Sequence, residues 1–219
     1  MLNIFDIDNT VLKKTTTWYF LLESFSQKII KFSQIRGLPL EWLRYKLGRP
    51  NQMFIEEAIK KLAGIDKTIL EDVAQSCFEN YMKKNIFLDA YKLINEMHQR
   101  KEKVIFASSS FYTLIQPLER FLGSSESVAS ALEFAQGKTT GRVVGESCFG
   151  ISKKNAVEAW FNRQGQDPQD ACFYTDSYTD LPLMEYCGQA VAVNPDRILE
   201  QAAKKHGWKI LHFKKTLGR

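Results

Sequence analysis

The chain has 219 residues, 44% of them hydrophobic and 12% aromatic, which is typical of a soluble globular protein and excludes a disordered chain. Its net charge of +5 comes from 30 basic and 25 acidic residues without a long like-charged block, so charge gives no reason to expect nucleic-acid binding. We expect no membrane-spanning segment, no signal peptide, and reduced cysteines because the four are widely scattered: Cys77, Cys148, Cys172 and Cys187. Together these features predict a cytoplasmic protein.

The first predicted element is a short buried strand over residues 2–5, which ends in two carboxylates, Asp6 and Asp8. Ligands of open α/β sheets collect at the carboxyl ends of such strands. Residues i and i+2 of an extended chain project to one side, so both carboxylates can reach one reacting group. Their mutual repulsion requires a cation or a shared proton.

Residues 13–103 read as several short helices, because apolar residues recur at helical spacing between glycines and prolines. Within them, residues 36–49 combine basic and apolar side chains and could form a basic amphipathic helix. Such a pattern is more often a packed helix with a solvated face than a peripheral membrane anchor.

Strands and helices alternate over the rest of the chain. Strand 104–107 runs into Ser108, Ser109 and Ser110, and a helix start directly after these hydroxyls would form a phosphate cradle. A hairpin or flap is predicted from residues 127–134 and 141–144. The remaining predictions are a helix carrying Val157 and Trp160, strands 171–175, 190–193 and 208–213, and helices from about residues 181 and 196. This alternation predicts a doubly wound parallel sheet.

Several polar side chains therefore share one predicted location, the carboxyl ends of the strands: Asp6, Asp8, Ser108, Lys153, Asp176 and Asp180. Phosphoryl transfer brings an anionic nucleophile to an anionic phosphate, so it needs cations and hydrogen-bond donors at such a site. Lysine supplies one cation, and aspartate oxygens are the ligands that Mg²⁺ prefers.

These motifs resemble the haloacid dehalogenase superfamily of phosphohydrolases. The resembling segments are Asp6-Ile-Asp8-Asn-Thr10, Ile105-Phe-Ala-Ser108, Lys153, and Tyr174-Thr-Asp176-Ser-Tyr-Thr-Asp180. More narrowly, Gly150-Ile-Ser-Lys153 and Asn194-Pro195-Asp196 are similar to the phosphoserine-phosphatase-like branch, subfamily IB. The resemblance implies a Rossmann-like core made of residues 1–13 and 104–219, with an all-helical cap, residues 14–103, inserted between the first two motifs.

The resemblance also implies a role for each matching residue. Asp6 would be the nucleophile that forms an aspartyl-phosphate, and Asp8 the general acid and base. Ser108, with Ser109 beside it, and Lys153 would bind the phosphate. Asp6, Asp176 and the backbone carbonyl of Asp8 would hold Mg²⁺, and Asp180 would orient Lys153 or a metal-bound water.

The sequence is compatible with three functions. The leading one is a Mg²⁺-dependent phosphomonoesterase for a small metabolite such as phosphoserine or histidinol phosphate. A phosphatase for a lipid head group such as phosphatidylglycerophosphate is motivated by residues 36–49. A non-catalytic phospho-ligand-binding protein is the third. Lys154 is the alternative to Lys153, and Asp180 could equally cap the helix that follows it.

Overall fold

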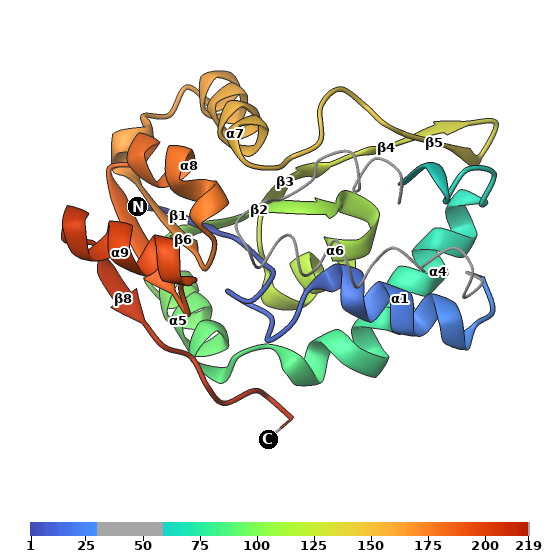
Figure 1. Ribbon diagram of the computed structural model, residues 1–219, viewed down its shortest axis with the longest axis horizontal. Coiled ribbons are helices and arrows are strands. Elements are labelled where there is room, and N and C mark those ends of the chain that lie inside the picture. Colours follow the sequence, from blue (N-terminus) through green and yellow to red (C-terminus); the bar gives the residue numbers. More distant parts are fainter. Residues whose placement is uncertain (30–58, 219) are drawn as a thin grey trace.

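The centre of the fold is a six-stranded parallel sheet in the order β3-β2-β1-β6-β7-β8 (Figure 1). The computed structural model describes residues 1–29 and 59–218. The strands are β1 (Leu2–Phe5), β2 (Lys103–Phe111), β3 (Glu126–Ser130), β6 (Ala171–Thr175), β7 (Gln189–Val193) and β8 (Lys209–Leu211). The first strand thus lies in the middle of the sheet, paired with β2 and β6.

Helices cover both faces of this sheet, as the alternating pattern predicted. Ile4 belongs to the apolar cluster on one face and Phe5 to the cluster on the other, because successive side chains of a strand alternate. The face of Ile4 is covered by α7 (Ile151–Gln164), α8 (Leu181–Tyr186) and α9 (Arg197–His206). The face of Phe5 is covered by α5 (Leu88–Gln99) and α6 (Tyr112–Leu122). The predicted doubly wound α/β fold is confirmed.

The region before β2 is helical in its described parts. It holds α1 (Thr16–Ser26) and α4 (Lys67–Cys77), which continues into a π-helical turn, η2 (Phe78–Met82), and a 3₁₀ turn, η3 (Lys83–Asn85). Helix α5 falls inside the range predicted for the cap but packs on the sheet, and the boundaries of core and cap stay a prediction. The basic apolar stretch 36–49 lies outside the described residues. None of the described helices is long and apolar enough to cross a membrane.

The predicted hairpin is correct only from residue 132 onward. Residues 127–130 belong to β3, which pairs in parallel with β2 in the main sheet. The hairpin consists of β4 (Leu132–Ala135) and β5 (Lys138–Val143), joined through Gln136 and Gly137, both with positive φ. Backbone hydrogen bonds attach it to the helical region, where Thr139 donates to the Ile65 carbonyl at 2.9 Å. Sequence alternation shows that a segment is a strand but not which strand it joins.

Candidate active site

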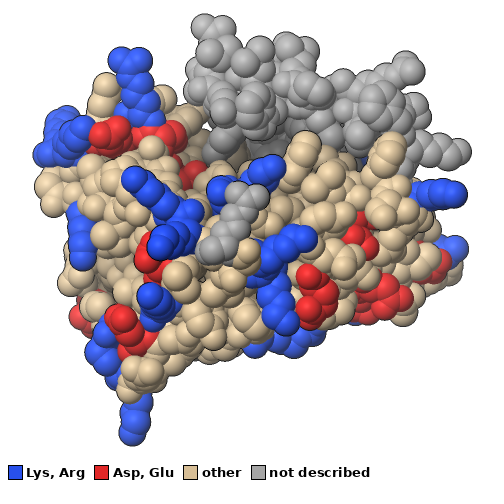
Figure 2. Space-filling model, turned by 90° about the horizontal axis from the view of Figure 1, so that it is seen from below, with Lys and Arg blue, Asp and Glu red and all other residues tan. Residues whose placement is uncertain are grey.

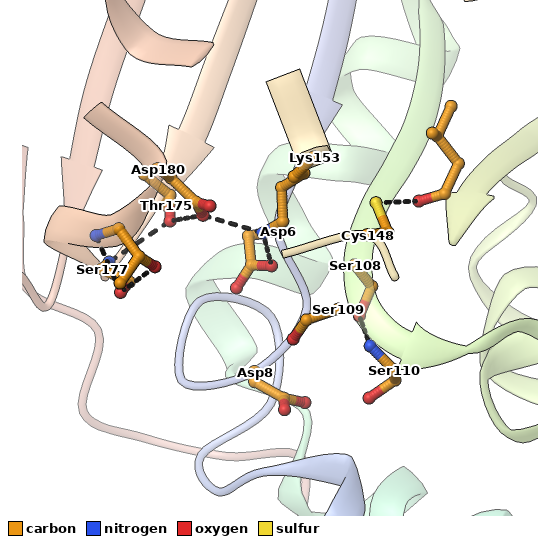
Figure 3. Close-up of polar contacts among 12 residues, drawn as sticks. Asp6, Asp8, Ser108, Ser109, Ser110, Cys148, Lys153, Thr175, Ser177 and Asp180 are labelled. Carbon is orange, nitrogen blue, oxygen red and sulfur yellow. Dashed lines mark hydrogen bonds and ion pairs between the residues drawn. The ribbon is translucent and has the colours of Figure 1, made fainter. Parts of the chain in front are cut away.

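Asp6 lies at the carboxyl end of the central strand β1 and is buried. Lys153, on the first turn of α7, is also buried and reaches across to it: its Nζ lies 2.8 Å from Oδ1 of Asp6 and 2.8 Å from Oδ2 of Asp180 (Figure 3). Lys154, the alternative lysine, instead pairs with Glu158 one turn along the same helix, at 2.7 Å. The structure therefore directs Lys153 into this carboxylate cluster and turns Lys154 away from it.

The Asp180 side chain binds Lys153 in the cluster and does not cap the helix that follows it. Its side chain makes no capping hydrogen bond to α8. Besides Lys153, its Oδ2 accepts a 2.7 Å hydrogen bond from the Thr175 hydroxyl at the end of β6. Its other oxygen, Oδ1, is buried and has no hydrogen-bond partner in the structure. Burying an unpaired carboxylate oxygen costs folding free energy, so the buried charge of Asp180 needs the compensating charge of Lys153.

Asp8 lies where the loop after β1 meets helix α1. The carboxylate is half-buried, and its Oδ1 accepts a 2.8 Å hydrogen bond from the backbone N–H of Thr16, the first residue of α1. The positive end of the helix dipole therefore faces Asp8. The Thr16 hydroxyl contacts the Ser110 hydroxyl, so Asp8, α1 and β2 are linked at one point.

The serine segment differs from its prediction. Strand β2 continues through the serines to Phe111, and α6 begins only at Tyr112, so the serines do not sit at a helix N-terminus. An irregularity in the pairing of β2 with β3 lies between Ser108 and Phe111. Ser108 is fully buried and accepts from the backbone N–H of Ser110 at 3.2 Å. Figure 3 shows Ser109 directed toward the space between Asp6 and Asp8.

Asp176 follows β6 and is half-buried beside the cluster. Its backbone carbonyl accepts from Asp196 at 2.9 Å, but its carboxylate makes no recorded hydrogen bond or ion pair with any described residue. It also lines a groove of about 780 Å³ together with Asn9 and Lys13. The carboxylate thus remains available to a ligand from outside the chain.

The cluster holds more carboxylates than cations, and the pKa values reflect this imbalance. Burial raises the pKa of Asp6 to about 7, with Lys153 opposing and Asp180 and Asp8 adding to the rise. Burial also raises the pKa of Asp8 to about 6, against the lowering effect of the Thr16 hydrogen bonds. The pKa of Asp176 is raised well above its ordinary value by burial and then by the charge of Asp6. One lysine does not neutralise this cluster.

Burial lowers the pKa of Lys153, but the carboxylates of Asp180 and Asp6 more than offset burial, and the pKa is raised. Lys153 therefore keeps its charge at every physiological pH. The residual negative charge and the hard oxygen donors of Asp6 and Asp176 fit a divalent cation such as Mg²⁺. In the described part of the chain no three acidic, histidine or cysteine side chains converge into a ready metal cage. Water and substrate oxygens would therefore have to complete the coordination.

Two contacts of the cluster were missed by sequence reasoning. Thr175, whose hydroxyl donates to Asp180, directly precedes Asp176. Its place as a hydroxyl residue at the end of a buried strand is a signal that could have identified this contact. Thr16, which binds Asp8, gave no such signal, because a row of threonines before a helix reads as capping alone.

Comparisons with known proteins agree with this arrangement. Residues 4–185 match the family described as haloacid dehalogenase-like hydrolase. The phosphoserine phosphatase SerB1 of Mycobacterium tuberculosis is 28% identical over 216 residues, covering 96% of this chain and 70% of the relative. The histidinol-phosphatase of Neisseria meningitidis is 27% identical over 224 residues, covering 97% of this chain and 99% of the relative.

Solved structures show the same fold. A phosphoserine phosphatase captured as a phospho-aspartyl intermediate analogue has a TM-score of 0.69 at 20% identity, covering 99% of this chain and 94% of that one. The family match spans most of the chain and includes every motif of the carboxylate cluster. The chain therefore belongs to the haloacid dehalogenase-like hydrolase family.

Proposed function

We propose that this protein is a Mg²⁺-dependent phosphomonoesterase that works through an aspartyl-phosphate on Asp6. The observation that carries the proposal is the buried bridge from Lys153 to Asp6 and Asp180 at the end of the central strand. It fixes one oxygen of Asp6, and it places a permanent cation where an incoming phosphate would add negative charge.

In the proposed reaction the free oxygen of Asp6 attacks phosphorus, and the bond from phosphorus to the leaving alkoxide breaks. Asp8, whose pKa burial raises to about 6, keeps a protonated fraction near neutral pH, and this form gives its proton to the alkoxide. The resulting Asp8 carboxylate then takes a proton from the water that hydrolyses the aspartyl-phosphate. The Thr16 amide holds the Asp8 carboxylate in place for both proton transfers.

Ser108, Ser109 and Lys153 are proposed to bind the phosphate, with Ser109 directed toward the space between Asp6 and Asp8 (Figure 3). Asp6, Asp176 and the backbone carbonyl of Asp8 would hold Mg²⁺. When bound, the ion would shield the phosphate from the carboxylates and polarise its oxygens. Asp180 positions Lys153 through their 2.8 Å contact.

The proposed substrate is a small phosphorylated metabolite, phosphoserine or histidinol phosphate in type, since relatives bear the names phosphoserine phosphatase and histidinol-phosphatase. A cytoplasmic location is proposed from the four cysteines, which are all free and buried. The lipid head-group alternative drew on residues 36–49, which lie outside the described residues. A purely binding role is disfavoured because the proposed nucleophile, acid, lysine and metal ligands lie at one end of the sheet.

The test is phosphate release from a panel of phosphoserine, histidinol phosphate, sugar phosphates, nucleotides and phosphatidylglycerophosphate, with Mg²⁺ and with a chelator. Selective release that requires Mg²⁺ supports the proposal. Release that persists in chelator contradicts the metal assignment. Binding of phosphate and Mg²⁺ without turnover of any substrate supports a binding role instead.

Replacing Asp8 by Asn should lower kcat/KM for phosphoserine by about 10²–10⁴, because general acid–base catalysis is lost in both steps. For p-nitrophenyl phosphate, whose leaving group needs no protonation, the first step should suffer less and the aspartyl-phosphate should accumulate. The mass of acid-quenched protein measures this intermediate. Asp72→Asn, an exposed change on α4, is the matched control. Equal losses on both substrates without an intermediate would contradict the role of Asp8.

Without divalent cations the protein should become less stable as pH rises from about 4 to about 7. The folded pKa values of Asp6 and Asp8, about 7 and about 6, exceed the ordinary value of 3.8, so their ionisation opposes folding across this interval. Mg²⁺ at about 100 times its Kd should restore about 2.7 kcal/mol. The rise in Tm should be larger near pH 8 than near pH 5, because ligands must be deprotonated.

Differential scanning calorimetry checks this expectation, with Asp176→Asn as the comparison. That variant should lose most of the Mg²⁺-dependent rise in Tm while retaining the Lys153 bridge. An unchanged rise in the variant would remove Asp176 from the proposed metal site.

A further inference from the structure

Three separate chain segments lie side by side beyond the carboxyl end of the sheet, and each carries a pair of lysines. Backbone hydrogen bonds of 2.9–3.0 Å join Lys13 to Asn85, Leu88 to Lys215, and Gly218 to Lys84. The segments thus bring together six side chains, here called the basic face: Lys13, Lys14, Lys83, Lys84, Lys214 and Lys215. Figure 2 shows Lys and Arg side chains gathered over the middle of the molecule seen from below.

The charge of the basic face is only slightly compensated. Lys83 pairs with Glu79 at 3.4 Å, with both side chains about half exposed. For the other five lysines no ion pair with a described residue is recorded, and all six lysines are exposed. Exposed ion pairs such as this one contribute little stabilising free energy. At least five positive charges therefore remain available to an anionic partner.

Exposed aromatic side chains lie beside two of these lysines, Lys14 and Lys83. Trp18 is 47% and Leu22 37% exposed, one turn apart on α1. Nζ of Lys14 lies 5.3 Å from the Trp18 ring centroid, and Nζ of Lys83 lies 5.5 Å from the ring of Phe121, which is 37% exposed. Lysines next to exposed tryptophan, phenylalanine and leucine are the composition of surfaces that enter the interface of anionic bilayers. Nucleic-acid readers instead favour arginine.

We propose that the basic face docks this protein on a membrane surface that carries anionic lipid headgroups. The lysines would bind the headgroups, and Trp18 and Leu22 would enter the interfacial layer. Lys13 and Lys214 also line the groove that contains Asp176, so the docked face adjoins the catalytic end of the sheet. This inference goes beyond the proposed phosphatase reaction and is tested without measuring turnover.

The test is sedimentation of the full chain with two kinds of vesicle, one of phosphatidylcholine alone and one of equal amounts of phosphatidylcholine and phosphatidylglycerol. We expect binding to the second only. Binding should weaken as salt is added, because the Debye length falls from about 10 Å at 0.1 M to about 3 Å at 1 M.

A variant with four lysines changed to Gln, at Lys83, Lys84, Lys214 and Lys215, should bind anionic vesicles at least about a hundredfold more weakly, since each lysine contributes about fivefold. Lys13 is left unchanged because it lies close to Asp8. The matched control removes four charges at the opposite end of the sheet and should bind normally: Lys101, Lys204, Lys205 and Lys209, each to Gln. Trp18→Ser should weaken binding while leaving its salt dependence unchanged.

Equal melting temperatures of the two quadruple variants show that any difference in binding does not come from unfolding. Binding to phosphatidylcholine alone, or an equal loss in the control variant, overturns the proposal. Binding to a short RNA or DNA duplex would also overturn the proposal if it were tighter than binding to the anionic vesicles and were weakened by the same lysine changes. The basic face would then be a nucleic-acid surface.

Discussion

Replacing Asp6 by Asn is expected to abolish phosphate release, with a loss on the order of 10⁴-fold or more, as for other covalent nucleophiles. The amide cannot form the acyl phosphate, and the rest of the cluster stays in place. Lys153 keeps its 2.8 Å partner Asp180, so the fold should survive. The measurement is single-turnover phosphate release together with the mass of acid-quenched protein, which should show a phosphoryl group on the native chain only.

Asp89→Asn serves as the matched control, because it makes the same chemical change at an exposed position at the start of α5. It should retain native turnover. Phosphate binding by the Asp6→Asn variant, measured by calorimetry, separates loss of chemistry from loss of the site. Turnover that survives in the variant would rule out Asp6 as the nucleophile.

Replacing Lys153 by Met should damage both catalysis and stability. Its ammonium joins two buried carboxylates, and breaking a buried ion pair by removing one partner costs about 3–5 kcal/mol. We also expect kcat/KM to fall about 10²–10³-fold, because the preorganised cation beside the phosphate is lost. The loss of stability should shrink as pH falls, since Lys153 no longer lowers the pKa of Asp6 in the variant and Asp6 can take up a proton.

Lys154→Met is an unusually close control for this variant. Lys154 is the neighbouring residue on the same helix, but it pairs with Glu158 at the partly exposed surface of α7. Losing that pair should cost no more than about 0.5 kcal/mol and leave turnover intact. Chemical denaturation across pH and steady-state kinetics of both variants provide the comparison. Similar effects of the two changes would contradict the special position of Lys153.

Short-range features of this protein are determined by the sequence itself. The apolar runs predicted β6 (Ala171–Thr175) over its full length and β7 (Gln189–Val193) to within a residue, because buried parallel strands are nearly continuous apolar segments. The alternation of such strands with helices predicted the doubly wound sheet, since parallel neighbours require helical crossovers. The spacing of the motifs also identified the family that the comparison found.

Contacts between distant segments were decided only by the tertiary structure. The spacing favoured Lys153 over Lys154, but only the rotation of α7 about its axis decides which of the two ammonium groups enters the cluster. Strand β2 runs on through the serines, and its pairing with β3 resumes at Phe111 after an irregularity that begins at Ser108. Likewise, no local pattern joins the three lysine pairs of the basic face, which lie far apart along the chain. Local patterns specify the elements, but long-range pairing and packing decide which side chains meet.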